Sequence, residues 1–224
     1  MNKVFQFITV LLFSVSTVAQ KSKTLSLTDF SKIEVFDRIT LVLVPANETK
    51  AEISGAYQNE VTLVQKNDVL KIRMPLKKLL DGEFTKVILY YKNLSRVEAN
   101  EGSTVSNTDV LQGQNIDFEA KEGAEIRINT EVEFAKSRAT TGGIIVLAGR
   151  AAVQEISIGT GGRFEGKDLQ TEETTVTITT GGNAQVNASE TVNAKVRAGG
   201  TIEVYGNPKN LNETRVLGGT IVRK

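Results

Sequence analysis

The chain contains no cysteine, no histidine and no tryptophan, and only three prolines in 224 residues. Without cysteine it has neither a disulfide framework nor the lipid-modified cysteine of a lipoprotein. Without histidine and cysteine, the Ser-His-Asp and Cys-His nucleophile arrangements are excluded, as are zinc sites built on imidazole or thiolate. The sequence therefore predicts no cofactor, no metal site and no catalytic residue of those kinds.

Long apolar runs are also scarce, and the one that stands out lies at the start of the chain. Lys3 is followed by an apolar run from Val4 to Val15, and Thr17-Val18-Ala19 supplies the small residues of a signal-peptidase site. The run is shorter than the roughly 20 apolar residues that span a bilayer. We therefore predict that residues 1–19 are a cleaved signal peptide, with a retained membrane anchor as the alternative. The mature chain is expected in the periplasm, on the outer-membrane surface or secreted, and not as a membrane-spanning protein.

Charge of one sign is missing too. Lys3 is the only charged residue of the predicted leader, so the mature chain carries 26 basic and 26 acidic residues, with no block of lysine or arginine. A neutral chain of mixed charges lacks the basic footprint of a nucleic-acid-binding protein. The same balance disfavours attraction of the chain as a whole to anionic lipid.

A repeat is the strongest feature that is present. Seven glycine-centred triplets recur through the second half of the chain: Glu101-Gly102-Ser103, Glu122-Gly123-Ala124, Thr141-Gly142-Gly143, Thr160-Gly161-Gly162, Thr180-Gly181-Gly182, Ala198-Gly199-Gly200 and Leu217-Gly218-Gly219. The intervals between their last residues are 21, 19, 19, 20, 18 and 19. A period this regular is typical of a solenoid in which each repeat is one supersecondary unit.

The residues after each triplet indicate strands. Apolar residues alternate with polar ones, as in Ile126-Arg127-Ile128 and Ile202-Glu203-Val204, which is the period of a β-strand. We therefore predict an all-β fold, a right-handed parallel β-helix, in which Ile126, Ile145, Phe164 and Ile202 lie in one interior file. An antiparallel sandwich is the alternative, but its turns usually recur every 8–12 residues.

The N-terminal part is less regular. Short strands are expected at Ile33–Val35, Ile39–Val44, Val69–Arg73 and Val87–Tyr91, with a turn at Asn67-Asp68. The chain is thus divided into residues 20–98, which begin and cap the stack, and residues 99–224, which form the regular coils.

The order of these segments resembles the bacterial family of putative auto-transporter adhesins with a head GIN domain. The resemblance rests on Ala19-Gln20, on the opening Phe30–Val35, on Leu41–Val44 followed by Val69–Ile72, and on the Gly-Gly coils. It implies an exported β-helical domain of a Bacteroidetes-like organism, with an adhesin role and no catalytic residues to carry over. Among the family's Gly-Ile-Asn signature, Gly143-Ile144 and Gly182-Asn183 are only partial matches, so no site is mapped from it.

Carboxylates and tyrosines supply the candidate sites. Asp117, Glu119 and Glu125 form a candidate carboxylate cluster, which would serve a carbohydrate-active lyase or hydrolase on the β-helix. A solvated strand face is the simpler interpretation. Tyr205 and Tyr91 are candidates for stacking on a sugar ring, because Tyr205 lies beside Glu203 on the predicted outer side and one of the adjacent tyrosines Tyr90 and Tyr91 must point outward.

One strand breaks the alternation. In Gly143-Ile144-Ile145-Val146-Leu147, Ile144 and Val146 are expected outside if Ile145 and Leu147 are in the core. We predict that Ile144 and Val146 form a partner or homo-oligomer surface, the alternative being coverage by the chain's own N-terminal strands. The favoured function is a non-catalytic binding module that recognises a glycan or a protein through its side faces. The alternatives are the enzyme described above and a structural assembly unit of the cell envelope.

Overall fold

The computed structural model describes residues 22–224, so the predicted signal peptide lies outside the described residues. Eighteen strands and two short 3-10 helices are joined in one continuous stack. The elements are β1 (Lys23–Ser26), β2 (Lys32–Val35), β3 (Thr40–Pro45), β4 (Lys50–Gly55), β5 (Thr62–Lys66), β6 (Val69–Arg73), η1 (Leu76–Lys78), η2 (Gly82–Phe84), β7 (Thr85–Tyr91), β8 (Arg96–Ala99), β9 (Thr104–Asn107), β10 (Leu111–Lys121), β11 (Glu125–Thr140), β12 (Ile144–Ile158), β13 (Arg163–Glu165), β14 (Leu169–Thr180), β15 (Asn183–Ala198), β16 (Thr201–Tyr205), β17 (Asn210–Leu217) and β18 (Thr220–Arg223).

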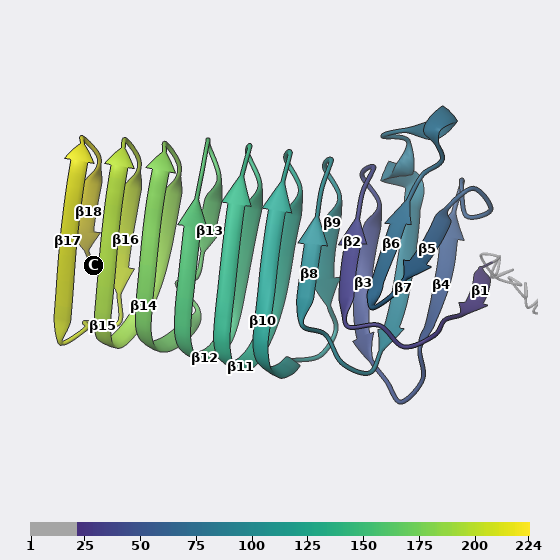
Figure 1. The fold of residues 1–224 in the computed structure, drawn as a ribbon, viewed down its shortest axis with the longest axis horizontal. Coiled ribbons are helices and arrows are strands. Elements are labelled where there is room, and N and C mark those ends of the chain that lie inside the picture. Colours follow the sequence, from purple (N-terminus) through teal and green to yellow (C-terminus); the bar gives the residue numbers. More distant parts are fainter. Residues whose placement is uncertain (1–21) are drawn as a thin grey trace, which may run out of the picture.

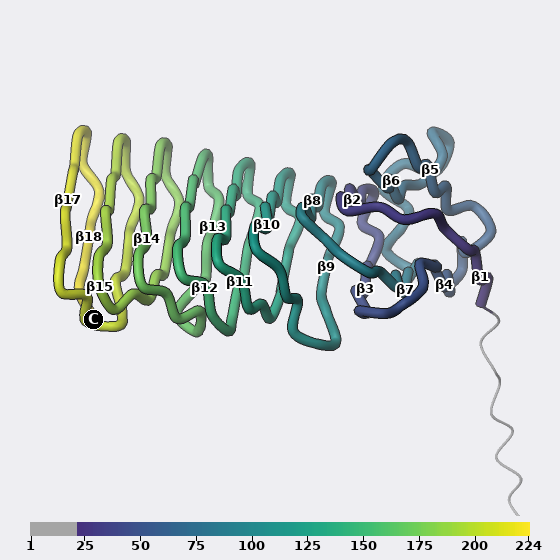
Figure 2. Tube along the Cα trace, turned by 60° about the horizontal axis from the view of Figure 1, so that its bottom comes forward, coloured from purple at the N-terminus to yellow at the C-terminus, as the bar shows by residue number. Residues whose placement is uncertain are grey.

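The coils are flattened into two layers, which follow one another along the long axis of the molecule (Figures 1 and 2). The front sheet of Figure 1 consists of β6, β2, β8, β10, β14 and β17 and of the second halves of β11, β12 and β15. The back sheet consists of β7, β3, β9, β13, β16 and β18 and of the first halves of β11, β12 and β15. Pairing within the regular coils is parallel, which confirms the β-helix and contradicts the sandwich.

The predicted interior file is confirmed. Val105, Ile126, Ile145, Phe164, Ala184, Ile202 and Ile221 are successive partners in the back sheet. Each is 7% exposed or less. Because equivalent positions lie one strand spacing apart, an apolar residue in one coil covers the apolar residue of the next. The 19-residue period is therefore the length of one circuit of the chain.

The glycine corners connect the front sheet to the back sheet through tight turns. At Thr141-Gly142 both residues have positive φ, 51° and 74°, and the N–H of Gly143 donates to the Thr140 carbonyl at 2.9 Å. This is the geometry of a type I′ turn, whose second residue is usually glycine. Glu122 occupies the same left-handed position as Thr141 one coil earlier. Glycine follows each of these residues and, having no Cβ, adopts the positive φ that the second turn position requires.

The N-terminal strands join the same stack in an order that differs from the chain order. β2 lies between β6 and β8, and β3 lies between β7 and β9. Antiparallel pairs, β1 with β4, β4 with β7 and β5 with β6, finish this end of the stack. The division of the chain at residues 98 and 99 stays a prediction; in the structure that position falls within β8.

The last coil differs from those before it. Glu213 and Arg215 on β17 are register partners of the buried Ala194 and Val196 of β15, so they occupy core positions of the repeat. The two side chains pair with each other, and the Arg215 guanidinium also donates to the Ile221 carbonyl at 3.4 Å. The apolar file of the front sheet thus ends in an ion pair that is open to solvent.

The front-sheet core contains a polar side chain that the alternation alone does not place there. Gln154 is 1% exposed and lies between its register partners Ala135 and Thr174. Among the described residues, neither its amide nitrogen nor its amide oxygen has a hydrogen-bond partner. Buried polar groups without partners carry a desolvation cost of about 1–3 kcal/mol.

Replacing Gln154 with methionine is therefore expected to raise the free energy of unfolding by about 1–2 kcal/mol, because methionine has a similar length and no strong polar group. Urea denaturation monitored by circular dichroism measures this change. The matched control is Gln170→Met on the exposed side of β14, which should change stability by less than about 0.5 kcal/mol. A Gln154→Met protein less stable than the wild type would contradict the prediction.

Candidate functional site

The outer face of the back sheet carries side chains of changing chemistry from β11 to β16. Since alternate residues of each strand point outward, neighbouring strands present pairs of side chains in register. In order, these pairs are Glu125 and Arg127, Ile144 and Val146, Arg163 and Glu165, Asn183 and Gln185, and Thr201 and Glu203. A charged pair, an apolar pair, a second charged pair and a polar strip therefore lie side by side on one sheet face.

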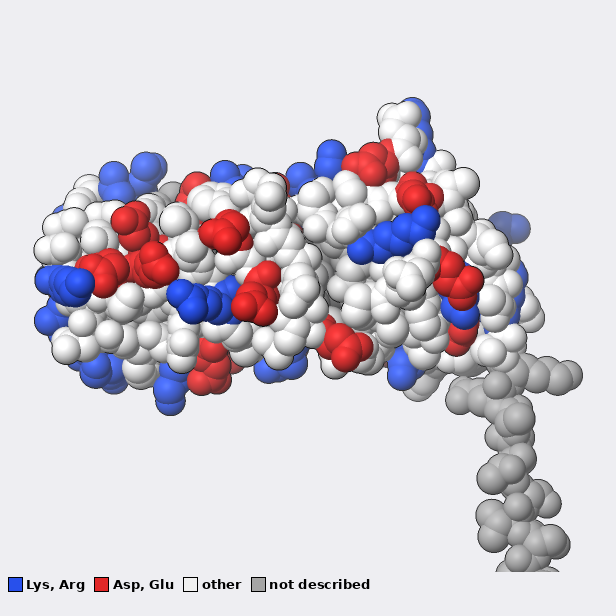
Figure 3. All heavy atoms as spheres, turned by 90° about the horizontal axis from the view of Figure 1, so that it is seen from below, with Lys and Arg blue, Asp and Glu red and all other residues white. Residues whose placement is uncertain are grey.

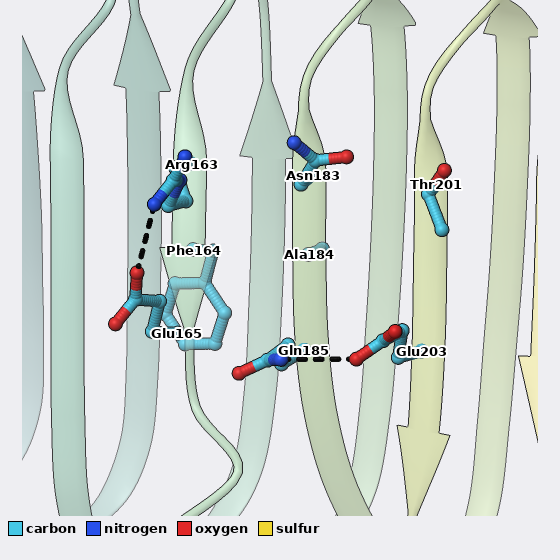
Figure 4. Close-up of a pocket in the computed structure, with 8 residues that line it drawn as sticks. All are labelled: Arg163, Phe164, Glu165, Asn183, Ala184, Gln185, Thr201 and Glu203. Carbon is cyan, nitrogen blue, oxygen red and sulfur yellow. Dashed lines mark hydrogen bonds and ion pairs between the residues drawn. The ribbon is translucent and has the colours of Figure 1, made fainter. Parts of the chain in front are cut away.

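A shallow depression of about 220 Å³ lies over β13, β15 and β16 (Figure 4). We call it the Arg163–Glu203 hollow. Its lining residues are Arg163, Phe164, Glu165, Asn183, Ala184, Gln185, Thr201 and Glu203. Its outward side chains bond to one another: Arg163 pairs with Glu165 at 3.4 Å, and the Gln185 amide donates to the Glu203 carboxylate at 2.9 Å.

Glu203 is the most strongly held anion of the hollow. The hydrogen bond from Gln185, then that from the Tyr205 hydroxyl at 3.0 Å, lower the pKa of Glu203 below its ordinary value, and Lys224 adds to the effect. Burial acts in the opposite direction but is outweighed. Glu203 is therefore a carboxylate, and an acceptor only, at neutral pH.

Tyr205 points outward beside Glu203, as the alternation predicted. The Lys167 ammonium lies 5.5 Å from the centre of its ring, within the range of a cation–π contact. The ring is thus fixed at the edge of the Arg163–Glu203 hollow by two contacts. Whether it stacks on a sugar stays a prediction.

The expectation for Tyr91 needs correction. Tyr91 is 4% exposed, and burial, followed by the charge of Asp109, raises its pKa to about 12. Its ring belongs to the core and is not available for stacking. Its neighbour Tyr90 is the outward tyrosine, with the Lys50 ammonium 4.6 Å from its ring centre. Two adjacent residues of one strand face opposite sides, and the sequence did not show which one faced out.

Ile144 and Val146 lie on the outer face of the back sheet and are only partly buried. Ile144 sits between Glu125 and Arg163, and Val146 between Arg127 and Glu165. The strand that carries them pairs with β11, β13 and β14, and with none of the N-terminal strands. Coverage by N-terminal strands is therefore not the explanation for this apolar pair. A role for it as a partner or oligomer surface stays a prediction.

The three candidate carboxylates are not brought together. Asp117 and Glu119 face outward on the front sheet, whereas Glu125 faces outward on the back sheet and pairs with Arg127 at 2.6 Å. The cluster predicted from their closeness in sequence is therefore wrong, because the corner at Glu122-Gly123 reverses the chain between them.

Glu119 instead belongs to an ion-pair network with Arg96, Glu98, Lys121 and Arg138. Arg96 bridges Glu98 at 2.8 Å and Glu119 at 2.5 Å, and Lys121 bridges the same two carboxylates at 2.9 and 3.1 Å. Burial opposes ionisation of Glu98, but the hydrogen bonds and charges of Lys121 and Arg96 outweigh it and lower its pKa. Arg96, Glu98, Glu119 and Lys121 thus hold adjacent coils together. Because each is paired, none of the four is a free acid or base.

Acid is expected to weaken this network. Because the pKa of Glu98 is lower in the folded protein than in the unfolded chain, ionised Glu98 stabilises the fold at neutral pH, and this contribution disappears as the pH falls through the folded-state pKa. Glu98→Gln should lower the free energy of unfolding by about 1–2 kcal/mol at pH 7, allowing for the solvent that reaches Arg96 and Lys121. The difference from wild type should shrink below pH 4.5, the ordinary glutamate value.

Urea denaturation at several pH values measures the difference. Glu155→Gln is the control, since the Glu155–Lys136 pair at 3.4 Å is about half exposed and should contribute almost nothing. A Glu98→Gln difference that stays constant from pH 7 to pH 3 would show that ionisation is not its cause.

Most residues of the Arg163–Glu203 hollow were missed by sequence reasoning. Asn183, Gln185 and Arg163 come from three different coils, and each looks like an ordinary solvated position on its own strand. Aligning the outward residues of successive coils by the 19-residue period would have placed them side by side. In the sequence the period is evident mainly from the glycine triplets and the apolar core residues, which repeat, whereas the outward residues vary in chemistry from coil to coil.

Comparison with known proteins places this fold in a family. The family described as putative auto-transporter adhesin, head GIN domain, matches residues 29–208. The chain belongs to this family. The order of segments that suggested the resemblance therefore reflects membership of this family. The description of the head GIN domain family points to adhesion rather than to catalysis.

Solved structures support the same fold for this head GIN domain chain. A putative adhesin from Bacteroides fragilis matches with a TM-score of 0.84 at 19% identity, over 93% of this chain and 98% of that one. A putative lipid binding protein from Parabacteroides distasonis has a TM-score of 0.71 at 13% identity, covering 92% and 97%. A putative adhesin from Parabacteroides merdae has a TM-score of 0.66 at 17% identity, covering 92% and 97%. No curated protein matches the chain.

The described part of this family member, residues 22–224, contains no helix long and apolar enough to cross a membrane. Membership of an adhesin family indicates an exported or surface protein, and the compartment within that class stays a prediction.

Proposed function

We propose that the protein is an exported, non-catalytic adhesion module that binds a glycan on the outer face of its back sheet. The Arg163–Glu203 hollow is the centre of the proposed site. The observation that carries the proposal is the convergence there of three kinds of planar polar side chain, the guanidinium of Arg163, the amide of Gln185 and the carboxylate of Glu203. Membership of an adhesin family supports a binding role.

These groups suit a sugar. Adjacent hydroxyls of a pyranose ring act as both donors and acceptors. They match the row of Glu165, Gln185 and Glu203, which alternate acceptor, donor, acceptor at strand spacing, with the donor Arg163 beside Glu165 on β13. The hollow is shallow, which fits a flat ligand such as a sugar ring or a short chain of them. Tyr205 at its edge supplies an aromatic face against which the apolar side of a sugar packs.

Binding is favoured over hydrolysis because the contacts of Glu203 hold it as a carboxylate. Glu165 and Glu203 are two strands apart, about 10 Å between their Cα atoms, a separation at which a pair of carboxyl groups can act on a glycosidic bond. A glycosidase, however, requires one carboxyl group with a raised pKa as the general acid. The pKa of Glu203 is instead lowered, and Glu165 is paired with Arg163. Glu203 is therefore a poor general acid, which supports binding over hydrolysis.

A glycan array probed with the mature protein tests the proposal. The wild type should bind a defined set of glycans, and Gln185→Ala and Glu203→Gln should each weaken binding to those glycans by about tenfold, the value expected for losing a hydrogen bond to a charged group. Matched controls on the front sheet, Asn193→Ala and Glu155→Gln, should bind as the wild type does. Absence of glycan binding, or equal losses in the controls, would contradict the proposal, and release of reducing sugar from a bound glycan would favour the enzyme.

The Ile144–Val146 pair supports a second candidate function, association with a protein or with another copy of the chain. The pair is a partly exposed apolar strip between two Glu–Arg pairs, which is the anatomy of a small interface with a polar rim. Val146→Glu should reduce the mass measured by light scattering if the strip joins two copies. A monomeric wild type would contradict the oligomer version.

A further inference from the structure

The connection between β6 and β7 forms a rigid finger, residues 75–84, that contains both 3-10 helices. It projects beyond the corners of the neighbouring coils, at the upper right of Figure 1. The corners of the regular coils, from β8 to β18, are turned by two to four residues. The ten-residue finger is therefore longer than the corners of the regular coils.

The base of the finger is fixed by a buried carboxylate. Asp37 is 0% exposed and accepts hydrogen bonds from the N–H groups of Met74 at 2.9 Å and Leu80 at 3.1 Å. Its own carbonyl accepts the N–H of Gly82 at 3.0 Å. One residue of the β2–β3 turn thus binds Met74, directly before the finger, and Leu80 and Gly82 within it, so the finger is held in a defined conformation rather than left as a loose loop.

The fixed finger exposes large apolar side chains. Leu76 is 80% exposed, Phe84 65%, Leu79 45% and Leu80 43%. In the rest of the described chain, exposed large apolar residues are scattered singly or lie in the last coil. Scattered apolar residues are ordinary, but four on one short, well-held protrusion indicate a surface that binds something apolar.

Along the finger the basic residues come first and the acidic residues follow. Lys77 and Lys78 lie between Leu76 and Leu79, whereas basic and acidic side chains are mixed over the face of the molecule that Figure 3 shows. Lys78 is held over the Tyr57 ring at 4.0 Å and near Glu60 at 3.8 Å, whereas Lys77 is exposed and forms no ion pair with any residue of 22–224. Of the acidic residues that follow, Glu83 pairs with Arg38 at 3.7 Å.

We propose that the finger inserts shallowly into the interface of a lipid bilayer, with Leu76 and Leu79 among the acyl chains and Lys77 at the phosphate level. A convex tip of apolar side chains with a cation between them suits a deformable interface, in which the lysine stem stays in the apolar layer while its ammonium reaches the phosphates. A protein partner would instead need a pocket shaped to the tip. The neutral balance of the whole chain does not oppose this, because the attraction is local and mainly apolar. The proposal is independent of the glycan site.

Sedimentation with lipid vesicles tests the proposal on the mature protein. Vesicles of phosphatidylethanolamine with phosphatidylglycerol should bind the wild type, and phosphatidylcholine vesicles should bind it less. Leu76→Ser combined with Leu79→Ser should lower the partition coefficient at least about tenfold, because two leucines no longer leave water. Lys77→Gln should lower binding to the anionic vesicles only.

A double variant in the last coil, Val216→Ser with Leu217→Ser, is the matched control, since these residues are 60% and 74% exposed on the other end of the stack. It should bind vesicles as the wild type does. Circular dichroism and thermal unfolding of each variant show that the fold is kept. Absence of vesicle binding by the wild type, or an equal loss in the control, would overturn the proposal, as would binding of the finger only to a protein from the envelope. None of these results depends on whether the glycan array succeeds.

Discussion

Alanine in place of Gly143 is expected to lower the free energy of unfolding by about 3 kcal/mol or more, although the change adds a single methyl group. A Cβ at this position would lie 2.1 Å from the Ala120 carbonyl oxygen and 2.5 Å from its carbonyl carbon. Both atoms are backbone of the preceding coil, so no side-chain rotation relieves the contact. The two coils would have to separate locally, and the parallel hydrogen bonds on either side of the corner would lengthen.

The adjacent glycine supplies the control. Gly142 has φ of 74°, and a Cβ there would meet no atom closer than 4.0 Å. Gly142→Ala should therefore cost only the conformational penalty of a left-handed residue, about 1 kcal/mol. Denaturant unfolding of the two single variants, under identical conditions, measures the difference. Equal costs at both positions would mean that the corner glycines are required only for their backbone conformation and not for the close approach of the coils.

Loss of the Asp37 carboxylate is the second change expected to have a large effect, about 3 kcal/mol for Asp37→Ala. The substitution leaves two N–H groups without their acceptor, that of Met74 in a buried bond and that of Leu80 in a partly buried one, at roughly 1–3 kcal/mol for a buried group and less for a partly buried one. Asp37 also has a positive φ of 62°, a conformation that aspartate and asparagine adopt more readily than alanine.

Hydrogen exchange locates the effect of the Asp37 substitution. In Asp37→Ala the amides of residues 74–84 should exchange faster than in the wild type, while the amides of β11 to β16 should change little. Asp37→Asn should cost less, since its amide oxygen can still accept one of the two bonds. The exposed Asp68, which accepts the Ser31 N–H at 2.7 Å, is the comparison: Asp68→Ala should cost about 1 kcal/mol at most. Fast exchange of residues 74–84 already in the wild type would show that the finger is not held.

The regular coils were predictable because one apolar residue per circuit must cover the next. Ile126, Ile145, Phe164 and Ile202 repeat at the interval that the structure shows to be the circuit length. The N-terminal order was not predictable in this way. No period marks β2 as the neighbour of both β6 and β8, because that pairing is made between segments far apart in the chain and of similar composition.

The candidate site shows the same limit. Alternation along a strand correctly placed Tyr205, Ile144 and Val146 on the outer side, since that property depends only on local sequence. It did not decide between Tyr90 and Tyr91, and it grouped Glu125 with Asp117 although a corner separates them. Contacts between coils depend on the register of pairing, which a reading along one strand does not contain.

The sequence does not mark the finger, because its special feature is not in its own residues. Pro75–Phe84 reads as an apolar and lysine-rich connection of ordinary kind. What makes it a rigid protrusion is Asp37, which lies 37 residues before Met74 and 43 before Leu80. A distant acceptor for two backbone N–H groups is a tertiary feature, visible only in three dimensions.

The pair formed by Glu213 and Arg215 bears on how copies of this molecule can meet. A β-helix ends in strand edges with unpaired backbone groups, and a second molecule could in principle continue the ladder from such an edge. Continuation at β17 would require the charges at these two core positions to leave water, at several kcal/mol for each ion. Growth into a filament through this end is thereby disfavoured, and encounters with other molecules are directed to the broad sides of the rod.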